Sequence, residues 1–278
     1  MTSKAMTLAF IGGGNMASAL GAGLIGKRCG AHDVHVIDPN EAARERWRKQ
    51  GTTVAAAADE TLASRNVWIL AVKPQSLKEA VLACKPWLRE DTLVISIAAG
   101  ISAATLSRWL GEPERPWTRL VRCMPNTPAL IGEGATGVMA LKGVTQEDRA
   151  VAQQMLGAVG KVVWVDTDAH IDAVTALSGS GPAYVFLFLE ALIQGGVAQG
   201  LTPEQARTLA FATLAGATEL AALSPEPLAT LRDRVTSKGG TTAAALDVFG
   251  REGFSGIVMQ AMDAARDRAA DMSRELAD

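Results

Sequence analysis

The chain has 278 residues and a formal net charge of −2, with 27 Lys and Arg residues against 29 Asp and Glu residues. Hydrophobic residues make up 48% and charged residues 20%, a globular balance that argues against a disordered chain. The nearly balanced charge gives no overall field that would attract nucleic acid or an acidic membrane. We therefore expect neither as a partner, and a length that suits one large or two modest domains.

The spacing of the cysteines and the length of the apolar runs indicate in which cellular compartment the protein works. The sequence contains three scattered cysteines: Cys29, Cys84 and Cys123. They form no C-x-x-C pair, which argues against a disulfide framework or a metal cluster and predicts a cytoplasmic protein. Met1–Ala5 is too short and polar for a signal peptide. The longest apolar candidate, Ala183–Ile193, is interrupted by Glu190 and falls short of the roughly 18 residues that span a bilayer, so we expect a buried helix there.

Up to Val165, expected strands alternate with expected helices. The expected strands are Thr7–Ile11, Val34–Asp38, Val67–Val72, Leu93–Ala98 and Leu120–Cys123. The expected helices are Met16–Arg28, Glu41–Gln50, Gln75–Leu88 and Ala103–Leu110. This alternation predicts a parallel sheet with right-handed crossovers, which Gly137–Leu141 and Val162–Val165 extend at one edge.

After Val165 the pattern becomes helical, with almost no strand signal. Ala-rich and Leu-rich segments are punctuated by turns such as Gly179-Ser180-Gly181-Pro182 and Lys238-Gly239-Gly240. We place the domain boundary at Thr167, with an α/β domain over residues 1–167 and an all-α domain over residues 168–278.

A glycine-rich loop follows the first expected strand. Gly12-Gly13-Gly14-Asn15-Met16-Ala17 fits the pattern G-x-G-x-x-G/A and opens a helix, which is the context that a dinucleotide-binding motif requires. In this motif the first glycine makes the tight turn, Gly14 lets the pyrophosphate approach, and Ala17 allows close helix–strand packing. The helix N-terminus then offers N–H groups to the phosphates. We therefore predict a Rossmann domain.

The second expected strand ends in Asp38, at a distance from the loop where an acidic residue can bind the adenosine ribose. Such a carboxylate favours NAD and repels a 2′-phosphate. Four cations follow on the next helix, however: Arg44, Arg46, Arg48 and Lys49. Any one of them could pair with that phosphate, so the sequence leaves NADPH and NADH open as the cofactor.

Three further turns follow expected strands and are predicted to form the floor of a cleft, because ligands of open α/β sheets bind at the carboxyl ends of strands. The turns are Ala71-Val72-Lys73-Pro74-Gln75, Ala98-Ala99-Gly100 and Met124-Pro125-Asn126-Thr127-Pro128. In the helical half, Val235–Thr242 combines exposed backbone at Gly239 and Gly240 with two threonines at a helix start. Such a segment is either an ordinary capped helix start or a carboxylate site built from N–H groups and hydroxyls, without a metal.

Taken together, these segments resemble the pyrroline-5-carboxylate reductase family nearly from end to end. The segments that carry the resemblance are Ile11–Met16, Val72–Gln75, Ser96–Ile101, Arg122–Pro128, Ser178–Tyr184 and Val235–Thr242. The first is common among dehydrogenases, whereas the others, in this order and spacing, are specific to the family. There are three departures from the family pattern: Lys238 replaces a proline, Gly250 an acidic or amide residue, and Ala58 an asparagine that often contacts the cofactor.

The resemblance implies an enzyme that reduces 1-pyrroline-5-carboxylate to L-proline with NADPH or NADH, the last step of proline biosynthesis. Thr242 would hydrogen-bond the ring nitrogen and serve as the catalytic residue. The substrate carboxylate would be held by the loop around it: Ser237, Gly239, Gly240, Thr241 and Thr242. The cofactor would be held by three groups of residues: Gly12, Gly13, Gly14, Asn15, Met16 and Asp38; Val72, Lys73 and Pro74; Ala98, Ala99, Gly100, Met124, Pro125 and Asn126. A protonated cyclic imine is already electrophilic, so its reduction needs positioning more than a strong general acid.

Two other functions fit parts of the same pattern. The β-hydroxyacid dehydrogenases share a Rossmann domain followed by helices and resemble this chain around Ser178–Gly181, but they carry a catalytic lysine on the next helix. Here no lysine appears between Ser178 and Lys238, and alcohol oxidation needs such a base whereas imine reduction does not. A non-catalytic, NADP-binding regulator is the other alternative, which loss of Thr242 or a blocked cleft would favour.

The sequence also predicts self-association. Ala183–Ile193 is apolar on nearly every face, and a small helical domain has limited means to cover such a helix by itself. A second copy could cover it by symmetric packing. The resemblance likewise implies interlocked C-terminal dimerisation domains that complete each active site, and in some members rings of dimers.

Overall fold

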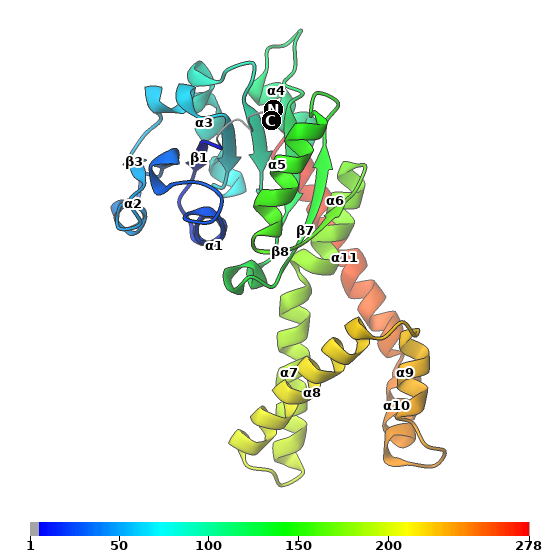
Figure 1. The fold of residues 1–278 in the computed structure, drawn as a ribbon. Coiled ribbons are helices and arrows are strands. Elements are labelled where there is room, and N and C mark those ends of the chain that lie inside the picture. Colours follow the sequence, from blue (N-terminus) through cyan, green and yellow to red (C-terminus); the bar gives the residue numbers. More distant parts are fainter. Residues whose placement is uncertain (1–5, 278) are drawn as a thin grey trace. The chain divides into compact units, whose positions relative to one another are not determined.

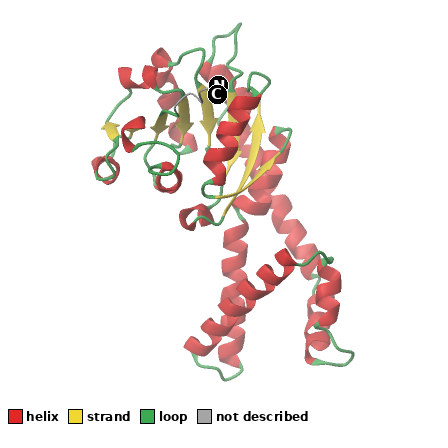
Figure 2. Cartoon of the chain, in the orientation of Figure 1, coloured by secondary structure: helices red, strands yellow, loops and turns green. Residues whose placement is uncertain are grey.

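The computed structural model describes residues 6–277; Met1–Ala5, where the sequence indicates no signal peptide, lies outside this range. By its internal contacts the chain divides into two compact units. Unit 1 holds the residues up to Ser180 together with those from Ala265 onward, and unit 2 is Gly181–Ala264. Among the described residues, all strands belong to unit 1 and unit 2 is helical (Figure 2). This confirms the predicted class of a Rossmann domain followed by helices.

Unit 1 is built on one eight-stranded sheet with the order β3-β2-β1-β4-β5-β6-β7-β8 (Figure 1). The strands are β1 Leu8–Ile11, β2 Val34–Ile37, β3 Thr53–Ala55, β4 Val67–Leu70, β5 Leu93–Ser96, β6 Leu120–Met124, β7 Gly134–Ala140 and β8 Gly160–Trp164. Neighbours pair in parallel except β6 and β7, which are antiparallel. The expectation of a wholly parallel sheet is therefore wrong at this pair. A parallel crossover needs about a dozen residues or more, and the short connection between β6 and β7 holds only one helical turn, η4 Thr127–Ile131.

The helices of unit 1 are α1 Asn15–Leu24, α2 Glu41–Arg48, α3 Pro74–Cys84, α4 Ala103–Leu110, α5 Gln146–Gly157 and α6 Asp168–Val174. Short turns of helix are η1 Ala31–Asp33, η2 Glu60–Ser64, η3 Lys85–Trp87 and the π-helical η5 Thr175–Gly179. The four predicted helices are present: α4 has the predicted bounds, and the other three end two to four residues earlier than predicted. The elements β3 and α5 are not among the predicted ones.

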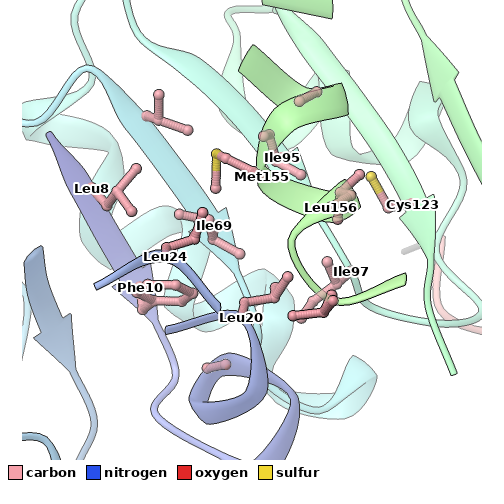
Figure 3. Packing of buried hydrophobic residues seen from close by; sticks show 14 of the residues in the cluster. Leu8, Phe10, Leu20, Leu24, Ile69, Ile95, Ile97, Cys123, Met155 and Leu156 are labelled. Carbon is pink, nitrogen blue, oxygen red and sulfur yellow. The ribbon is translucent and has the colours of Figure 1, made fainter. Parts of the chain in front are cut away.

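Hydrophobic side chains cover both faces of this sheet, because successive strand residues point to opposite sides. On one face, Leu8 and Phe10 of β1 pack in a cluster with Leu20 of α1 and Met155 of α5 (Figure 3). On the other face, Ala9 and Ile11 belong to a second cluster that includes residues of α3, α4 and α6. The strands therefore consist of nearly continuous apolar runs, and their carboxyl ends are held in fixed positions.

Unit 2 contains α7 Gly181–Ala198, α8 Pro203–Leu223, α9 Leu228–Arg234, α10 Thr241–Arg251 and the first part of α11 Phe254–Glu275. A capping box starts α8, since the side chains of Thr202 and Gln205 each accept the other residue's backbone N–H. A Cβ added to Gly196 would lie 3.1 Å from Cβ of Ala206, so the glycine allows α7 and α8 to approach closely. The two helices form an antiparallel pair joined by a short turn (Figure 1).

Helix α7 leaves most of its apolar surface uncovered within the single chain. Leu189 is its one buried residue, while Phe186 is 59% and Leu187 68% exposed. The helical stretch Asp168–Ala198 contains a window long and apolar enough to cross a membrane, judged by length and composition alone. Within one chain, the expectation that this helix is buried is therefore not met. The expectation that no apolar stretch is long enough to span a membrane is not met either. Glu190 interrupts the apolar run in the sequence, but a helix of this length remains apolar on average despite one charged residue.

The last turns of the chain return to unit 1, which the sequence analysis did not foresee. Leu276 packs against the second core cluster, and Arg108 of α4 donates to the carbonyl of Ala277 at 3.5 Å. Gly100 has φ +67°, and a Cβ there would lie 2.9 Å from Cβ of Met272. The C-terminal segment therefore packs directly on the turn after β5.

Candidate active site

The first residue of the glycine loop, Gly12, has a conformation and surroundings that only glycine tolerates. Its φ is +98°, and a Cβ would lie 2.7 Å from the carbonyl oxygen of Ala71 and 2.8 Å from Cγ1 of Val72. Its N–H donates to the carbonyl of Ile37 at 2.8 Å. The tight turn predicted at Gly12 is therefore present, and it packs against the segment that follows β4.

The second glycine is held on both sides by the protein itself. The N–H of Gly13 donates to Oδ2 of Asp38 at 2.7 Å, and its carbonyl accepts from Nε1 of Trp47 at 3.0 Å. Trp47 is fully buried, and a Cβ on Gly21 would lie 2.4 Å from its ring. Trp47 was not singled out from the sequence, although its place on the buried side of α2 with Ala43 is a usable signal. Asp38 and Trp47 together fix the shape of the loop.

The third glycine leaves open space for a ligand. A Cβ on Gly14 would meet no atom within 4 Å, and Gly14 and Asn15 are both exposed. Helix α1 has Gly14 as its N-cap, without a side-chain cap, and its first backbone bond runs from Ser18 N to Gly14 O at 2.9 Å. The N–H groups of the first turn therefore face outward at the positive end of the helix dipole. This surface fits the pyrophosphate of a dinucleotide.

The other predicted cofactor residues of unit 1 follow β4, β5 and β6, which are parallel neighbours, so they share one edge of the sheet (Figure 1). Lys73 is exposed at the N-cap of α3 and Pro74 is the first residue of that helix. Ala98 and Gly100 are buried while Ala99 is partly open. The structure thus brings together at the carboxyl edge Gly12–Met16, Asp38, Val72–Pro74, Ala98–Gly100 and Met124–Asn126.

The turn after β6 is anchored by its own side chains. The amide of Asn126 donates to the carbonyl of Ser178 at 3.0 Å and accepts from the N–H of Ala135 at 2.8 Å. A Cβ on Gly179 would lie 2.6 Å from Cε of Met124, so this glycine is needed for close packing. The side chain of Asn126, predicted to bind cofactor, is therefore committed to holding the turn against η5.

A buried ion cluster supports the same strand, and the sequence analysis missed it. Arg122 in β6 is almost fully buried and pairs with Asp168, and with Asp172 at 3.3 Å. Asp168 also accepts the N–H of Ala103, at the start of α4, at 3.0 Å. Burial raises the pKa of Asp172, and Arg122 opposes that effect. The only signal in the sequence was a single arginine inside an otherwise apolar strand, Leu120–Met124.

The cysteine of β6, Cys123, and the histidine of β2, His35, are both buried. Burial raises the pKa of the Cys123 thiol well above its usual range, so no thiolate forms beside Met124. The three cysteines are free. The buried ring of His35 contacts Thr53 at 2.9 Å and Asp59 at 3.2 Å, within the edge of the sheet. Residues 6–277 contain no group of three His, Cys, Asp or Glu side chains that could hold a metal ion.

In unit 2, the predicted carboxylate-binding loop connects α9 to α10. Gly239 has φ +73°, and the N–H of Gly240 donates to the carbonyl of Ser237 at 3.0 Å. Gly240 is the N-cap of α10 and makes no side-chain cap. The first backbone bond of this helix runs from Ala244 N to Gly240 O at 3.2 Å. No side chain therefore caps the start of α10, so this segment is not an ordinary capped helix start.

The consequence is an open N-terminus with hydroxyls beside it. The first helical residues, Thr241 and Thr242, carry N–H groups that precede the first backbone bond of α10. Thr241 and Ser237 are exposed, and Thr242 is half-buried. Backbone N–H groups and hydroxyls at the positive end of a helix suit a carboxylate. The predicted residues of this loop thus lie together within unit 2.

Known proteins resemble this chain over almost its whole length. A family model described as pyrroline-5-carboxylate reductase dimerisation matches residues 168–272, and one described as NADP oxidoreductase, coenzyme F420-dependent, matches residues 7–100. The pyrroline-5-carboxylate reductase of Pseudomonas aeruginosa is 43% identical over 97% of both chains.

Solved structures agree with these relatives. A pyrroline-5-carboxylate reductase from Coxiella burnetii is 35% identical, with a TM-score of 0.88, over 97% of this chain and 99% of the other. The pyrroline carboxylate reductase of Plasmodium falciparum, solved with NADP bound, is 30% identical, with a TM-score of 0.84, over 96% and 98% of the two chains. Identity and coverage of this extent, together with the cofactor loop and the open helix start of α10, show that this chain belongs to the pyrroline-5-carboxylate reductase family.

Proposed function

We propose that this chain reduces 1-pyrroline-5-carboxylate to L-proline with a hydride from NADH or NADPH, the last step of proline biosynthesis. The observation that carries the proposal is the full-length similarity to proteins named for this reaction, at 41% to 43% identity in the two relatives from Pseudomonas aeruginosa and Pisum sativum. The geometry of each unit agrees with it, since unit 1 offers a dinucleotide surface and unit 2 a carboxylate surface.

The residues of the carboxyl edge would hold the nicotinamide cofactor, which supplies the hydride when bound. Gly14, Asn15 and Met16 would present backbone N–H groups to the pyrophosphate, and Asp38 would bind the adenosine ribose. The turns Val72–Pro74, Ala98–Gly100 and Met124–Asn126 would form the surface under the remainder of the cofactor. The packing of Met124 and the two hydrogen bonds of Asn126 keep that surface rigid.

The loop that precedes α10 would hold the substrate. The N–H groups of Gly240, Thr241 and Thr242, with the hydroxyl of Ser237 and the left-handed backbone at Gly239, would bind its carboxylate. The hydroxyl of Thr242 would accept a hydrogen bond from the protonated ring nitrogen. In the reaction the hydride forms a C–H bond at the imine carbon, and the C=N double bond becomes a C–N single bond. The nitrogen already carries its proton in the iminium form. The chain therefore has to orient the substrate rather than supply a strong acid.

The two other functions fit less well. Helix α7, the place of the catalytic lysine in β-hydroxyacid dehydrogenases, runs from Gly181 to Ala198 without a lysine. A purely regulatory, non-catalytic role has no support either, because Thr242 is present and a side chain at Gly14 would point into open space. Solved structures of a prephenate dehydrogenase, a reductive aminase and a putative oxidoreductase are 14% to 17% identical and share the fold alone.

We propose that the working protein is a cytoplasmic homodimer joined through the helical half. The match of residues 168–272 to a dimerisation model supports this proposal and the domain boundary after Thr167. We also propose that dimers join in rings, as the family resemblance implies, and that neither nucleic acid nor a membrane is a partner. The apolar stretch Asp168–Ala198 would then be covered by a second copy rather than by lipid.

The test is turnover by the purified full chain. With 1-pyrroline-5-carboxylate and NADH or NADPH, we expect oxidation of the cofactor and equimolar appearance of L-proline. A variant with Thr242→Ala serves as the matched control for a contaminating reductase. If the wild-type protein oxidises neither cofactor with this imine but reduces NAD with a β-hydroxyacid, the dehydrogenase alternative replaces the proposal.

A further inference from the structure

The charged side chains that follow β2 bear on the choice between NADH and NADPH, which differ by the phosphate on the adenosine ribose. Four cations lie on or just after α2: Arg44, Arg46, Arg48 and Lys49. Of these, Arg44 is closest along the helix to Asp38, and its side chain is only 13% exposed. It is the cation best placed to meet a 2′-phosphate.

Arg44 is already engaged at both ends of its guanidinium. Its Nη1 donates to the backbone carbonyl of Asp38 at 2.6 Å, and its Nη2 pairs with the carboxylate of Glu41. Arg48, one turn further along the same face, pairs with Glu45 and lies 3.4 Å from Glu41. The two arginines on this face are thus neutralised by carboxylates of their own helix.

The carboxylate of Asp38 has capacity left for ribose hydroxyls. Oδ2 accepts one hydrogen bond, from Gly13 N, and Oδ1 accepts one, from Asn40 N at 2.8 Å. An ionised carboxylate offers about four acceptor positions, so each oxygen can still accept from one hydroxyl. The start of α2, whose positive dipole end would attract a phosphate, is flanked by two carboxylates, Asp38 and Glu41.

We infer that this chain selects NADH over NADPH, and that Glu41 sets this selectivity together with Asp38 by neutralising Arg44, which would otherwise pair with the ribose phosphate. The inference rests on the proposed use of a nicotinamide cofactor. A dianionic 2′-phosphate would meet the carboxylates of Asp38 and Glu41, and the nearby Arg44 is already bound to both of these residues. Two ribose hydroxyls would instead meet a carboxylate ready to accept from them. The selectivity is therefore a property of unit 1 alone.

The test is calorimetric titration of the full chain with NADH and, separately, with NADPH, in the absence of substrate. For the wild-type protein we expect NADH to bind at least about tenfold more tightly, the scale of one unfavourable charge contact. Glu41→Gln is expected to improve NADPH binding by about threefold to tenfold and to leave NADH binding nearly unchanged, because it frees Arg44. Glu45→Gln, which removes a partner of Arg48 only, should change neither.

Asp38→Ser tests the second carboxylate separately from Glu41. Asp38 also accepts the N–H of Gly13 and so shapes the glycine loop. This substitution is expected to weaken the binding of NADH and to raise the affinity for NADPH relative to that for NADH. Wild-type binding of NADPH as tight as that of NADH would overturn the inference and leave the proposed reductase intact. An unchanged NADPH affinity in Glu41→Gln would overturn the role of Glu41. Failure of the wild-type chain to bind either cofactor would overturn both the inference and the proposed function.

Discussion

At the scale of single residues, three consecutive glycines meet three different demands. Gly12 needs a positive φ and a close approach to Ala71, Gly13 is held between Asp38 and Trp47, and Gly14 leaves space for a ligand. The tight turn that the pattern G-x-G-x-x-G/A predicts at Gly12 is present, and the space that it requires at Gly14 is open. The pattern did not predict the role of Gly13, because the contacts of Asp38 and Trp47 depend on how the ends of β2 and α2 meet the loop.

Gly14→Val should abolish cofactor binding without unfolding the protein. The new side chain would enter open space where the pyrophosphate must approach, and it meets no protein atom within 4 Å at Cβ. Calorimetric titration with NADH, together with thermal unfolding of the same sample, measures both quantities. Gly12→Ala is the contrasting control, since its Cβ would lie 2.7 Å from the carbonyl oxygen of Ala71 and should lower stability. Normal NADH affinity in a folded Gly14→Val protein would mean that the loop has another role.

Thr242→Ala should lower kcat/KM for the imine by about tenfold to a hundredfold, the scale of one lost hydrogen bond to a charged group. Thr242→Ser keeps the hydroxyl and should retain most of the activity. Thr241→Ala is the neighbouring control, because its N–H group remains and its side chain is exposed. Steady-state kinetics of the three variants decide the matter. Near-wild-type rates for Thr242→Ala would remove the hydroxyl from the site.

At the scale of elements, sequence patterns predicted the strands that carry the cofactor turns but not all of their neighbours. Strand β3 is three residues long at the sheet edge, and its Ala55 belongs to an alanine run that gives no strand signal. Helix α5 is largely polar, so its apolar periodicity is weak, although the capping box of Thr145 and Asp148 marks its start. The antiparallel β7 and the return of the C-terminal turns depend on long-range packing, which local patterns do not encode.

The start of α5 gives a test of stability against pH. Burial by itself would raise the pKa of Asp148, but hydrogen bonds from Arg119 at 2.7 Å and from Thr145 outweigh it and hold this pKa below its ordinary value of 3.8. A depressed pKa means that the stabilisation is present above pH 3.8 and is lost as pH falls through the lower, folded-state value. Asp148→Asn should therefore be less stable than wild type at neutral pH, by about 1–3 kcal/mol, and the difference should shrink in acid.

Urea denaturation at fixed protein concentration, repeated from neutral pH downward, measures that difference. Glu147→Gln changes an exposed carboxylate on the same turn of α5 and should alter the free energy of unfolding by no more than about 0.5 kcal/mol. If the gap between wild type and Asp148→Asn stays constant down to pH 3, which lies below 3.8, the pair with Arg119 is not what stabilises this end of the helix.

At the scale of the whole molecule, the open surface of α7 is the feature that a single chain leaves unexplained. Phe188 packs near Phe254 within the chain, with ring centroids 6.4 Å apart, whereas Phe186 and Leu187 are mostly exposed. The sequence predicts that this helix must be covered, because it is apolar all round, but the sequence does not encode which side chains one chain covers by itself.

Phe186→Glu should therefore shift the protein from dimer toward monomer or aggregate and lower its activity, because burial of a charge at an apolar interface is unfavourable. Size-exclusion chromatography with light scattering gives the mass. Gln194→Glu adds the same charge at an exposed polar position on the same helix and should leave the mass unchanged. A wild-type species of 29.0 kDa that is fully active at every concentration would contradict the proposed dimer.

We expect this chain to transfer a hydride to the C=N bond of a cyclic imine carboxylate. The most direct measurement uses NADH deuterated at the reactive position, purified wild-type protein and unlabelled 1-pyrroline-5-carboxylate, with mass analysis of the product. We expect L-proline that carries a single deuterium on the former imine carbon, and we expect Thr242→Ala to form this product much more slowly. Oxidation of the deuterated cofactor without labelled proline, or no oxidation at all, would contradict this expectation.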